Sequence, residues 1–380
     1  MVLTHADAAF QLTEFLFTTV LALLAARFIR AVPSIVLEII FGIVVGAGIF
    51  SLNMSSYGID VLSSIGLFAI FFEVGLDFDL TAPELTSATP ARSAAAGVAA
   101  SLVLVSMATL ALGYSLEAAV LVGLATVSTS VSVSVYSFRT LGPLSHFEAK
   151  VAVIAGLFDD LLGLVVIAIT ASLLSHSLAS LVSLAVSLVV VLVSYILKRR
   201  LSDRSFELGR LSRYVVVLAL IAVMAFLWRS FGLTLAIAGF VGGAFSGPML
   251  TDADQRVLIR LSSFLGPLFL VSIGLLVKLK GGLTFAEVLG ILVLSIALIA
   301  AKWANALTIG AEVKDRVLYW FSMVPSAEVA GIGLLLIEPK ISSSLELQAV
   351  LAVVVTALVA PFVITHRARR INPAEGSCPV

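Results

Sequence analysis

Two adjacent carboxylates in the middle of a long apolar segment are the first residues here that could do chemistry. Residues 151–170 read VAVIAGLFDDLLGLVVIAIT, and Asp159 and Asp160 are the only charges in this segment. Placing a carboxylate in hydrocarbon costs roughly 2.5–3.5 kcal/mol on insertion scales. Ionisable residues inside such segments are rare, and they mark ion or proton pathways when they occur. We therefore take this pair as the centre of a candidate site.

The depth of the pair suggests its partners. Asp159 lies about nine residues from either end of its apolar run, which at roughly 1.5 Å per helical residue is near the bilayer centre. Neighbours on a helix point about 100° apart, so the two carboxylates cannot face the same partner. Lys302, in LIAAKWANAL, is the one cation of the sequence at comparable depth. We expect Lys302 to pair with one aspartate while the other faces a water-filled cavity.

A carboxylate in such a cavity can bind either a proton or a bare monovalent cation. Hydroxyl and carbonyl oxygens would complete the shell of the cation. If the site can be exposed to either side only when its charge is neutralised, competition between the two ions produces exchange. The alternative is that the aspartates only hold helices together by hydrogen bonds, for which two adjacent acids are poorly suited.

The elements that must position these residues are membrane-spanning helices. Of the 380 residues, 60% are hydrophobic and 12% are charged, whereas soluble domains carry about 25% charge. We predict an all-α polytopic membrane protein with thirteen transmembrane helices, since the apolar runs are about 20 residues long. The expected spans are 9–30, 33–50, 60–79, 92–113, 117–141, 147–173, 177–198, 209–229, 232–248, 257–277, 285–310, 314–338 and 345–366.

Other features exclude several functions. The single cysteine, Cys378, allows no intramolecular disulfide. Three of the four histidines fall outside the spans, and His366 is the last residue of the final span. The sequence has no glycine-rich phosphate loop and no basic groove for nucleic acid. We therefore expect a transporter rather than an enzyme, with no cofactor, no nucleic-acid partner, and the bilayer, cations and protons as its partners.

The basic residues set an orientation. Of the 23 Lys and Arg, 18 fall on one side of the predicted topology and 4 on the other, and the remaining one is Lys302. Cytoplasmic loops are enriched in basic residues. This predicts a multi-pass protein of the cell membrane with its N-terminus outside and its C-terminus in the cytoplasm.

The sequence also contains an internal repeat. EIIFGIVVGAGIF in the second span is echoed by LAIAGFVGGAFSG in the ninth, and SIGLFAIFFEVGLDFDL in the third by FLGPLFLVSIGLLVKL in the tenth, so that Gly75 and Gly274 correspond. An offset of seven helices is odd, so the second copy is inverted. Two inverted-topology repeats with crossed, interrupted helices are typical of secondary transporters.

Two polar interruptions fall at equivalent positions of this repeat. The first is ATVSTSVSVSVYS in the fifth span, with Thr126, Ser128, Thr129 and Ser130. The second is SMVPSAEVAGIG in the twelfth, with Pro325 and Glu328. Each could alone be an ordinary packing feature. Together they predict two broken helices that lie side by side, with breaks at 126–132 and 324–329.

Taken in order, these motifs resemble the sodium/proton antiporters of the cation/proton antiporter superfamily, in the NhaA-like and Nap-like branch with paired aspartates. The motifs are Asp159–Asp160, the Thr129–Ser130 break, Lys302, and Met-Val-Pro-Ser-Ala-Glu-Val at 323–329. The resemblance implies that Asp160 is the main carrier of Na⁺ and protons. It also implies that Asp159 is the partner of Lys302 and that Glu328 neutralises helix-end dipoles at the crossing.

The resemblance further implies a homodimer that works by an elevator mechanism. A core domain (92–173 and 285–370) would slide against a dimerisation domain (9–80 and 208–280), and 177–198 would be a linker helix. One departure is Ser326, where relatives often have arginine, which puts in doubt any gating or pH-sensing role of that cation.

Several alternatives stay open. Na⁺ is the expected cation and Li⁺ would also fit, but K⁺/H⁺ exchange is an alternative. A sodium-coupled organic-anion symporter on the same scaffold would show similar repeats and crossed helices. An intramembrane aspartyl protease is disfavoured, because its two acids must face each other from different helices. A simple channel would not need a titratable pair with a lysine.

Overall fold

The structure, a computed structural model, describes residues 5–29, 32, 34–45, 57–76, 88–139, 147–175, 182, 185–186, 189–190, 193, 210–231, 235–275, 277, 282–326 and 328–371. Every regular element in this part of the chain is a helix, as the composition predicts. The expected linker helix at 177–198 lies mostly outside the described residues.

The helices follow the expected spans closely. In chain order they are α1 (His5–Phe28), α2 (Ser34–Val44), α3 (Tyr57–Leu76), α5 (Ala88–Ala111), α6 (Leu116–Ala125), α7 (Val131–Arg139), α8 (Phe147–Ser175), α10 (Arg210–Phe231), α11 (Leu235–Ser246), α12 (Asp252–Leu275), α13 (Phe285–Ala301), α14 (Trp303–Thr308), α15 (Arg316–Met323), α16 (Glu328–Ile337) and α17 (Ser343–Ile371). Three expected spans are each divided into two helices, at 126–130, at Lys302 and at 324–327.

Some of these helices meet the requirements for crossing a membrane by length and composition alone. Among the described residues they are Phe10–Phe28, Ala88–Ala111, Asp252–Leu275, Phe285–Thr308 and Ser343–Arg367. The chain therefore has the helices of a multi-pass membrane protein. The total of thirteen transmembrane helices stays a prediction.

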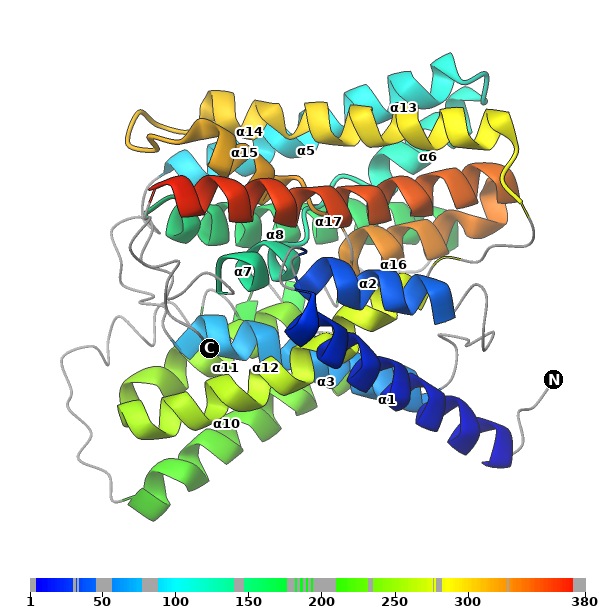
Figure 1. The fold of residues 1–380 in the computed structure, drawn as a ribbon. Helices are drawn as coiled ribbons and strands as arrows, with labels where there is room; N and C mark the ends of the chain where they lie inside the picture. Colours follow the sequence, from blue (N-terminus) through cyan, green and yellow to red (C-terminus); the bar gives the residue numbers. More distant parts are fainter. Residues whose placement is uncertain are drawn as a thin grey trace. The chain divides into compact units, whose positions relative to one another are not determined.

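The chain forms two compact units, and the first comprises residues 1–59, 87–167 and 270–380. Within it α13 packs along α17 and α5, as the yellow, red-orange and cyan helices of Figure 1 show. α5 also packs along α6 and α14. The small residues Ala152 and Ala155 of α8 are buried against Tyr319 and Met323 of α15. Small side chains on membrane helices allow such close packing, which brings the helix with the two aspartates against the broken span.

Backbone contact at glycine joins α2 to the last turns of α12 in this unit. A Cβ atom on Gly42 would lie 2.0 Å from the carbonyl oxygen of Val271, and one on Gly274 would lie 2.3 Å from that of Ile39. No side chain larger than hydrogen fits at either position without displacing backbone.

The second unit comprises residues 60–86 and 168–269. Here α3 and α11 meet at glycine in the same manner. A Cβ atom on Gly75 would lie 2.2 Å from the carbonyl oxygen of Phe240, and one on Gly243 would lie 2.0 Å from that of Phe72. The hydroxyl of Ser262 on α12 donates to the carbonyl oxygen of Ala69 at 3.0 Å. This unit is therefore held by close backbone packing and by a side-chain hydrogen bond between helices.

Two neighbouring glycines of α11 provide a matched test of this packing. We expect Gly243→Ala to destabilise the protein by about 1–3 kcal/mol, because the new methyl group meets backbone that cannot move away. Gly242→Ala is the control, since its methyl group would meet only side-chain atoms, the nearest at 3.5 Å. Thermal unfolding of the purified variants in detergent measures the difference. Equal melting temperatures for the two variants would contradict the predicted contact.

Candidate ion-binding site

Both interruptions expected from the sequence are present. The first, at 126–130, separates α6 from α7, and the second separates α15 from α16. The first is shorter than the predicted 126–132, because the helix resumes at Val131. The alternating serine and valine residues beyond this point form the helix α7. There the hydroxyl of Ser137 donates a hydrogen bond to the carbonyl oxygen of Val133, one turn earlier, at 2.7 Å.

The two interruptions are joined by hydrogen bonds. The amide of Ser130 donates to the carbonyl oxygen of Pro325 at 2.6 Å. The hydroxyl of Thr129 donates to the carbonyl oxygen of Met323 at 2.9 Å. A broken helix leaves carbonyl and amide groups without partners, at a cost of several kcal/mol each in a membrane. Each break therefore satisfies backbone groups that the other leaves open.

The half-helices pack crosswise around this junction. α6 packs on α16, and α7 packs on α15. A Cβ atom on Gly333 of α16 would lie 2.6 Å from the carbonyl oxygen of Ala125. A Cβ atom on Gly163 of α8 would lie 2.6 Å from the Cβ atom of Ser128. Glycine thus lets α16 approach the backbone of Ala125 and lets the aspartate-bearing helix approach the side chain of Ser128.

Lys302 is fully buried beside this break. Its Nζ donates to the carbonyl oxygen of Val127 at 2.7 Å and lies 3.2 Å from Oδ1 and 3.4 Å from Oδ2 of Asp159. The amide of Thr129 also donates to Oδ2 of Asp159. The structure thus places Lys302 against Asp159, the partner that the resemblance implied. Charge pairing and backbone hydrogen bonds together compensate the burial of both ions.

Asp160 is also buried but faces a different group. Its Oδ1 accepts a hydrogen bond from the hydroxyl of Ser128 at 3.0 Å, and 3% of the residue is exposed. The different partners of Asp159 and Asp160 follow from their positions about 100° apart on α8. A carboxylate next to a hydroxyl and an opened backbone segment offers oxygen donors, which suit a proton or a small monovalent cation.

The remaining predicted site residues, Thr126 and Glu328, lie at the edges of the two breaks. Thr126 ends α6, and its hydroxyl donates to the carbonyl oxygen of Val122 at 2.8 Å. Ser326, where relatives often have arginine, is buried, and its amide donates to the hydroxyl of Thr356 on α17 at 3.2 Å. Glu328 begins α16, but its side chain lies outside the described residues.

Several participants were not found from the sequence. The expected continuous span 285–310 is interrupted at Lys302, which forms a turn between α13 and α14. Three further buried residues, Ser93, Asn305 and Tyr319, form a polar network beside this turn. Asn305 and Ser93 were visible as polar residues within apolar spans, but nothing in the sequence showed that they meet.

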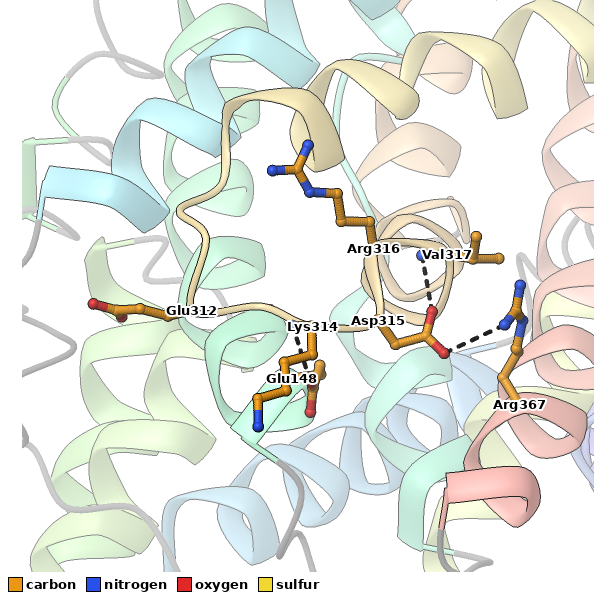
Figure 2. Close-up of a pocket in the computed structure, with 7 residues that line it drawn as sticks. All are labelled: Glu148, Glu312, Lys314, Asp315, Arg316, Val317 and Arg367. Atoms are coloured by element: carbon orange, nitrogen blue, oxygen red, sulfur yellow. Dashed lines mark hydrogen bonds and ion pairs between the residues drawn. The ribbon is translucent and has the colours of Figure 1, made fainter.

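A pocket of about 990 Å³ with charged lining residues lies in the first unit, apart from the two aspartates. Figure 2 shows its lining, which comes from the start of α8, the segment 312–317 and the end of α17. Asp315 accepts hydrogen bonds from two amides at the start of α15 and pairs with Arg367 at 3.6 Å. The side chains of Glu312 and Arg316 point in different directions in Figure 2. This pocket therefore does not gather its charges around one point, and Asp159 and Asp160 are not part of it.

A helical fold with a buried acid pair beside two joined helix breaks is typical of secondary transporters. The sequence model of the sodium/hydrogen exchanger family, transmembrane, matches residues 15–369. The chain belongs to this family, and with it to the cation/proton antiporter superfamily.

Comparison with individual proteins agrees with this assignment. The chain is 27% identical over 377 residues to the Na⁺/H⁺-K⁺ antiporter GerN of Bacillus cereus, covering 92% of this chain and 95% of that protein. It is 23% identical over 329 residues to the high-affinity Na⁺/H⁺ antiporter NhaS3 of Synechocystis sp. (strain ATCC 27184 / PCC 6803 / Kazusa), covering 80% and 70% of the two. Its fold is similar to the sodium proton antiporter MjNhaP1 of Methanocaldococcus jannaschii at pH 8, with a TM-score of 0.65, 16% identity, and 97% and 99% coverage.

The pairing of Lys302 with Asp159 predicts a non-additive effect on stability. Asp159→Asn leaves a buried ammonium without its anion, and Lys302→Met leaves a buried carboxylate without its cation, so each should destabilise by about 3 kcal/mol. The double variant should lose clearly less than the sum, because it buries no unpaired charge. Thermal unfolding in detergent measures the coupling, and Asp160→Asn with Lys302→Met is the control pair. Additive effects of the Asp159 and Lys302 substitutions would contradict the pairing.

Proposed function

We propose that this protein exchanges a monovalent cation for protons, and that the cation and the proton compete for Asp160. The expected cation is Na⁺, and Li⁺ would also fit. The observation that supports this proposal is that the two adjacent acids have different partners. Asp159 is paired with Lys302 and accepts a hydrogen bond from a backbone amide, whereas Asp160 accepts one from the Ser128 hydroxyl in the interrupted segment. A fixed neutral pair beside a second carboxylate leaves one negative charge over which a proton and a cation can compete.

The groups around Asp160 support a cation as its ligand. Na⁺ prefers oxygen donors, and the first break offers hydroxyls at Ser128, Thr129 and Ser130 together with carbonyl groups freed from helical hydrogen bonding. Thr126, Pro325 and Glu328 support the crossing that keeps this segment open. Binding of either ion removes the net charge of the site, and a neutral site crosses a low-dielectric barrier at far lower cost than a charged one.

We propose that the exchange is electrogenic, through Lys302. When Asp159 is ionised and Lys302 is protonated, the pair is neutral without any bound ion. Arrival of a cation at Asp160 would break this pair and let Lys302 lose its proton. Two protons would then cross for each cation, one from Lys302 and one from Asp160.

The proposed movement is an elevator motion of a core domain, 92–173 and 285–370, against a dimerisation domain, 9–80 and 208–280, in a homodimer. Support for a rigid core comes from the bonds that tie the two breaks, α8 and the Lys302 turn together. The segment 177–198 would link the two domains. The excess of basic residues on one side supports a cell-membrane protein with its N-terminus outside and its C-terminus in the cytoplasm.

Two pairs of glycine contacts support the inverted repeat. In the proposed repeat, the second span corresponds to the ninth and the third to the tenth. Contact between the second and tenth spans, at Gly42 and Gly274, then corresponds to contact between the ninth and third, at Gly243 and Gly75. Both contacts are present, each within one compact unit.

Potassium is a second candidate for the transported cation. The antiporter GerN is named for K⁺ as well as Na⁺ and H⁺, and this chain is similar to GerN over most of its length. The salt that drives proton flux identifies the transported cation. If no salt drives proton flux, sodium-driven uptake of an organic anion becomes the alternative to exchange.

Substitution of the carrier tests the proposed site. We expect Asp160→Asn to abolish exchange while leaving a folded protein, because the amide keeps the shape of the side chain and removes the charge over which the ions compete. Proteoliposomes that contain a pH-sensitive dye measure the pH change on addition of Na⁺, Li⁺ or K⁺ salts. Ser295→Ala is a suitable control, because among the described residues this hydroxyl donates within its own helix, to the carbonyl oxygen of Ile291 on α13. Undiminished transport by the Asp160 variant would refute the competition mechanism.

The charge carried per cycle is tested by imposing a voltage. With the membrane potential clamped by potassium and valinomycin, the rate of Na⁺-driven exchange should change with the imposed potential, because two protons cross for each Na⁺. In the Lys302→Met variant, which loses one of these protons, the dependence on potential should disappear. Wild-type rates that ignore the potential would show that Lys302 stays charged as a structural residue and that one proton exchanges for one cation.

A further inference from the structure

A buried polar network joins the Lys302 turn to two other helices of the first unit. Asn305 is fully buried on α14, and its Nδ2 donates to the carbonyl oxygen of Ser93 on α5 at 3.1 Å. The hydroxyl of Ser93 donates back to the carbonyl oxygen of Asn305 at 2.9 Å and lies 2.8 Å from the hydroxyl of Tyr319 on α15. A serine hydroxyl has one proton, so Tyr319 must be the donor to Ser93. The two hydroxyl groups therefore donate in one direction, from Tyr319 to Ser93 and from Ser93 to the carbonyl oxygen of Asn305.

The surface of α5 is shaped to receive Asn305. Gly97 lies one helical turn after Ser93 and presents no side chain, and a Cβ atom there would lie 2.1 Å from Oδ1 of Asn305. α14 packs along α5 at this point. The two reciprocal hydrogen bonds and the glycine together fix the position of α14 on α5.

The same network fixes the turn that carries Lys302. The amide of Asn305 donates to the carbonyl oxygen of Lys302 at 3.2 Å, which ties the first turn of α14 to the interruption. At the other end, Tyr319 lies on α15, whose last carbonyl accepts the hydroxyl of Thr129. Thr129 in turn donates its amide to Asp159. The contacts thus form a closed ring that passes through the Lys302–Asp159 pair.

We propose that Asn305, Ser93 and Tyr319 are positioning residues for Lys302. They hold the turn where the ammonium reaches both Asp159 and the carbonyl oxygen of Val127, and so they determine how strongly Lys302 competes with an arriving cation. This inference rests on the proposed function, in which cation binding at Asp160 breaks the Lys302–Asp159 pair. Loss of the network would loosen the ammonium and make the charge of the carboxylates more available to the cation.

Two substitutions test this role through the split between KM and maximal rate. Tyr319→Phe removes only one hydroxyl and keeps the buried ring, so the variant is expected to fold, and Asn305→Ala removes the amide clamp. For each we expect the KM for Na⁺ to fall by about two- to fivefold in proteoliposomes, the effect of losing a hydrogen bond that holds a competitor in place. Ser295→Ala, on the helix that precedes Lys302, is the matched control and should leave the KM unchanged.

The Lys302→Met background shows whether the effect passes through Lys302. There, Tyr319→Phe and Asn305→Ala should no longer change the KM for Na⁺. An unchanged KM in both single variants, with only a lower maximal rate or melting temperature, would overturn the positioning role, and so would a KM effect that persists in the Lys302→Met background. If Lys302→Met by itself leaves both the KM and the dependence on membrane potential at wild-type values, the proposed role of Lys302 fails first and this inference with it.

Discussion

The buried ion pair of Lys302 and Asp159 is the interaction on which the rest of the site depends. A membrane interior gives no water to either charge, so each must find its remaining partners in the protein. Lys302 finds the carbonyl oxygen of Val127, and Asp159 finds the amide of Thr129. In a continuous helix both backbone groups would be bonded within the helix. The interruption at 126–130 therefore provides the carbonyl and amide groups that form hydrogen bonds with the buried ion pair.

That interruption in turn requires a second one. A single broken helix would leave backbone groups unpaired in hydrocarbon, and here the break beside Pro325 supplies carbonyl oxygens to Ser130 and Thr129. Close approach at Gly163 and Gly333 is what brings the neighbouring helices within reach. The charges, the two breaks and the glycines thus form one set of mutually dependent features, which explains why conspicuously polar segments are tolerated in the middle of apolar spans.

The geometry also relates this chain to its family. Membership of the sodium/hydrogen exchangers and the similarity in fold to MjNhaP1 identify the scaffold. The described contacts show in addition that two acids on one helix can have different partners. The pair on α8 directs one carboxylate to a fixed cation and the other to the hydroxyl of Ser128. The proposed exchange rests on this difference between a carboxylate paired with a buried lysine and a carboxylate bonded to a hydroxyl.

The sequence by itself determined the helical class, the positions of most helices, the acid pair, Lys302 and the two polar interruptions. These features follow from local properties: the cost of burying charge, the length of apolar runs, and the missing amide of proline at 325. Only the tertiary structure decided that the helix resumes at Val131 after the first break, that the chain turns at Lys302, and that Asn305 meets Ser93 and Tyr319. These features depend on which helices come together and on which backbone groups lack hydrogen-bond partners within their own helix at the contact. Residues that are distant in sequence share no local pattern from which such a contact could be predicted.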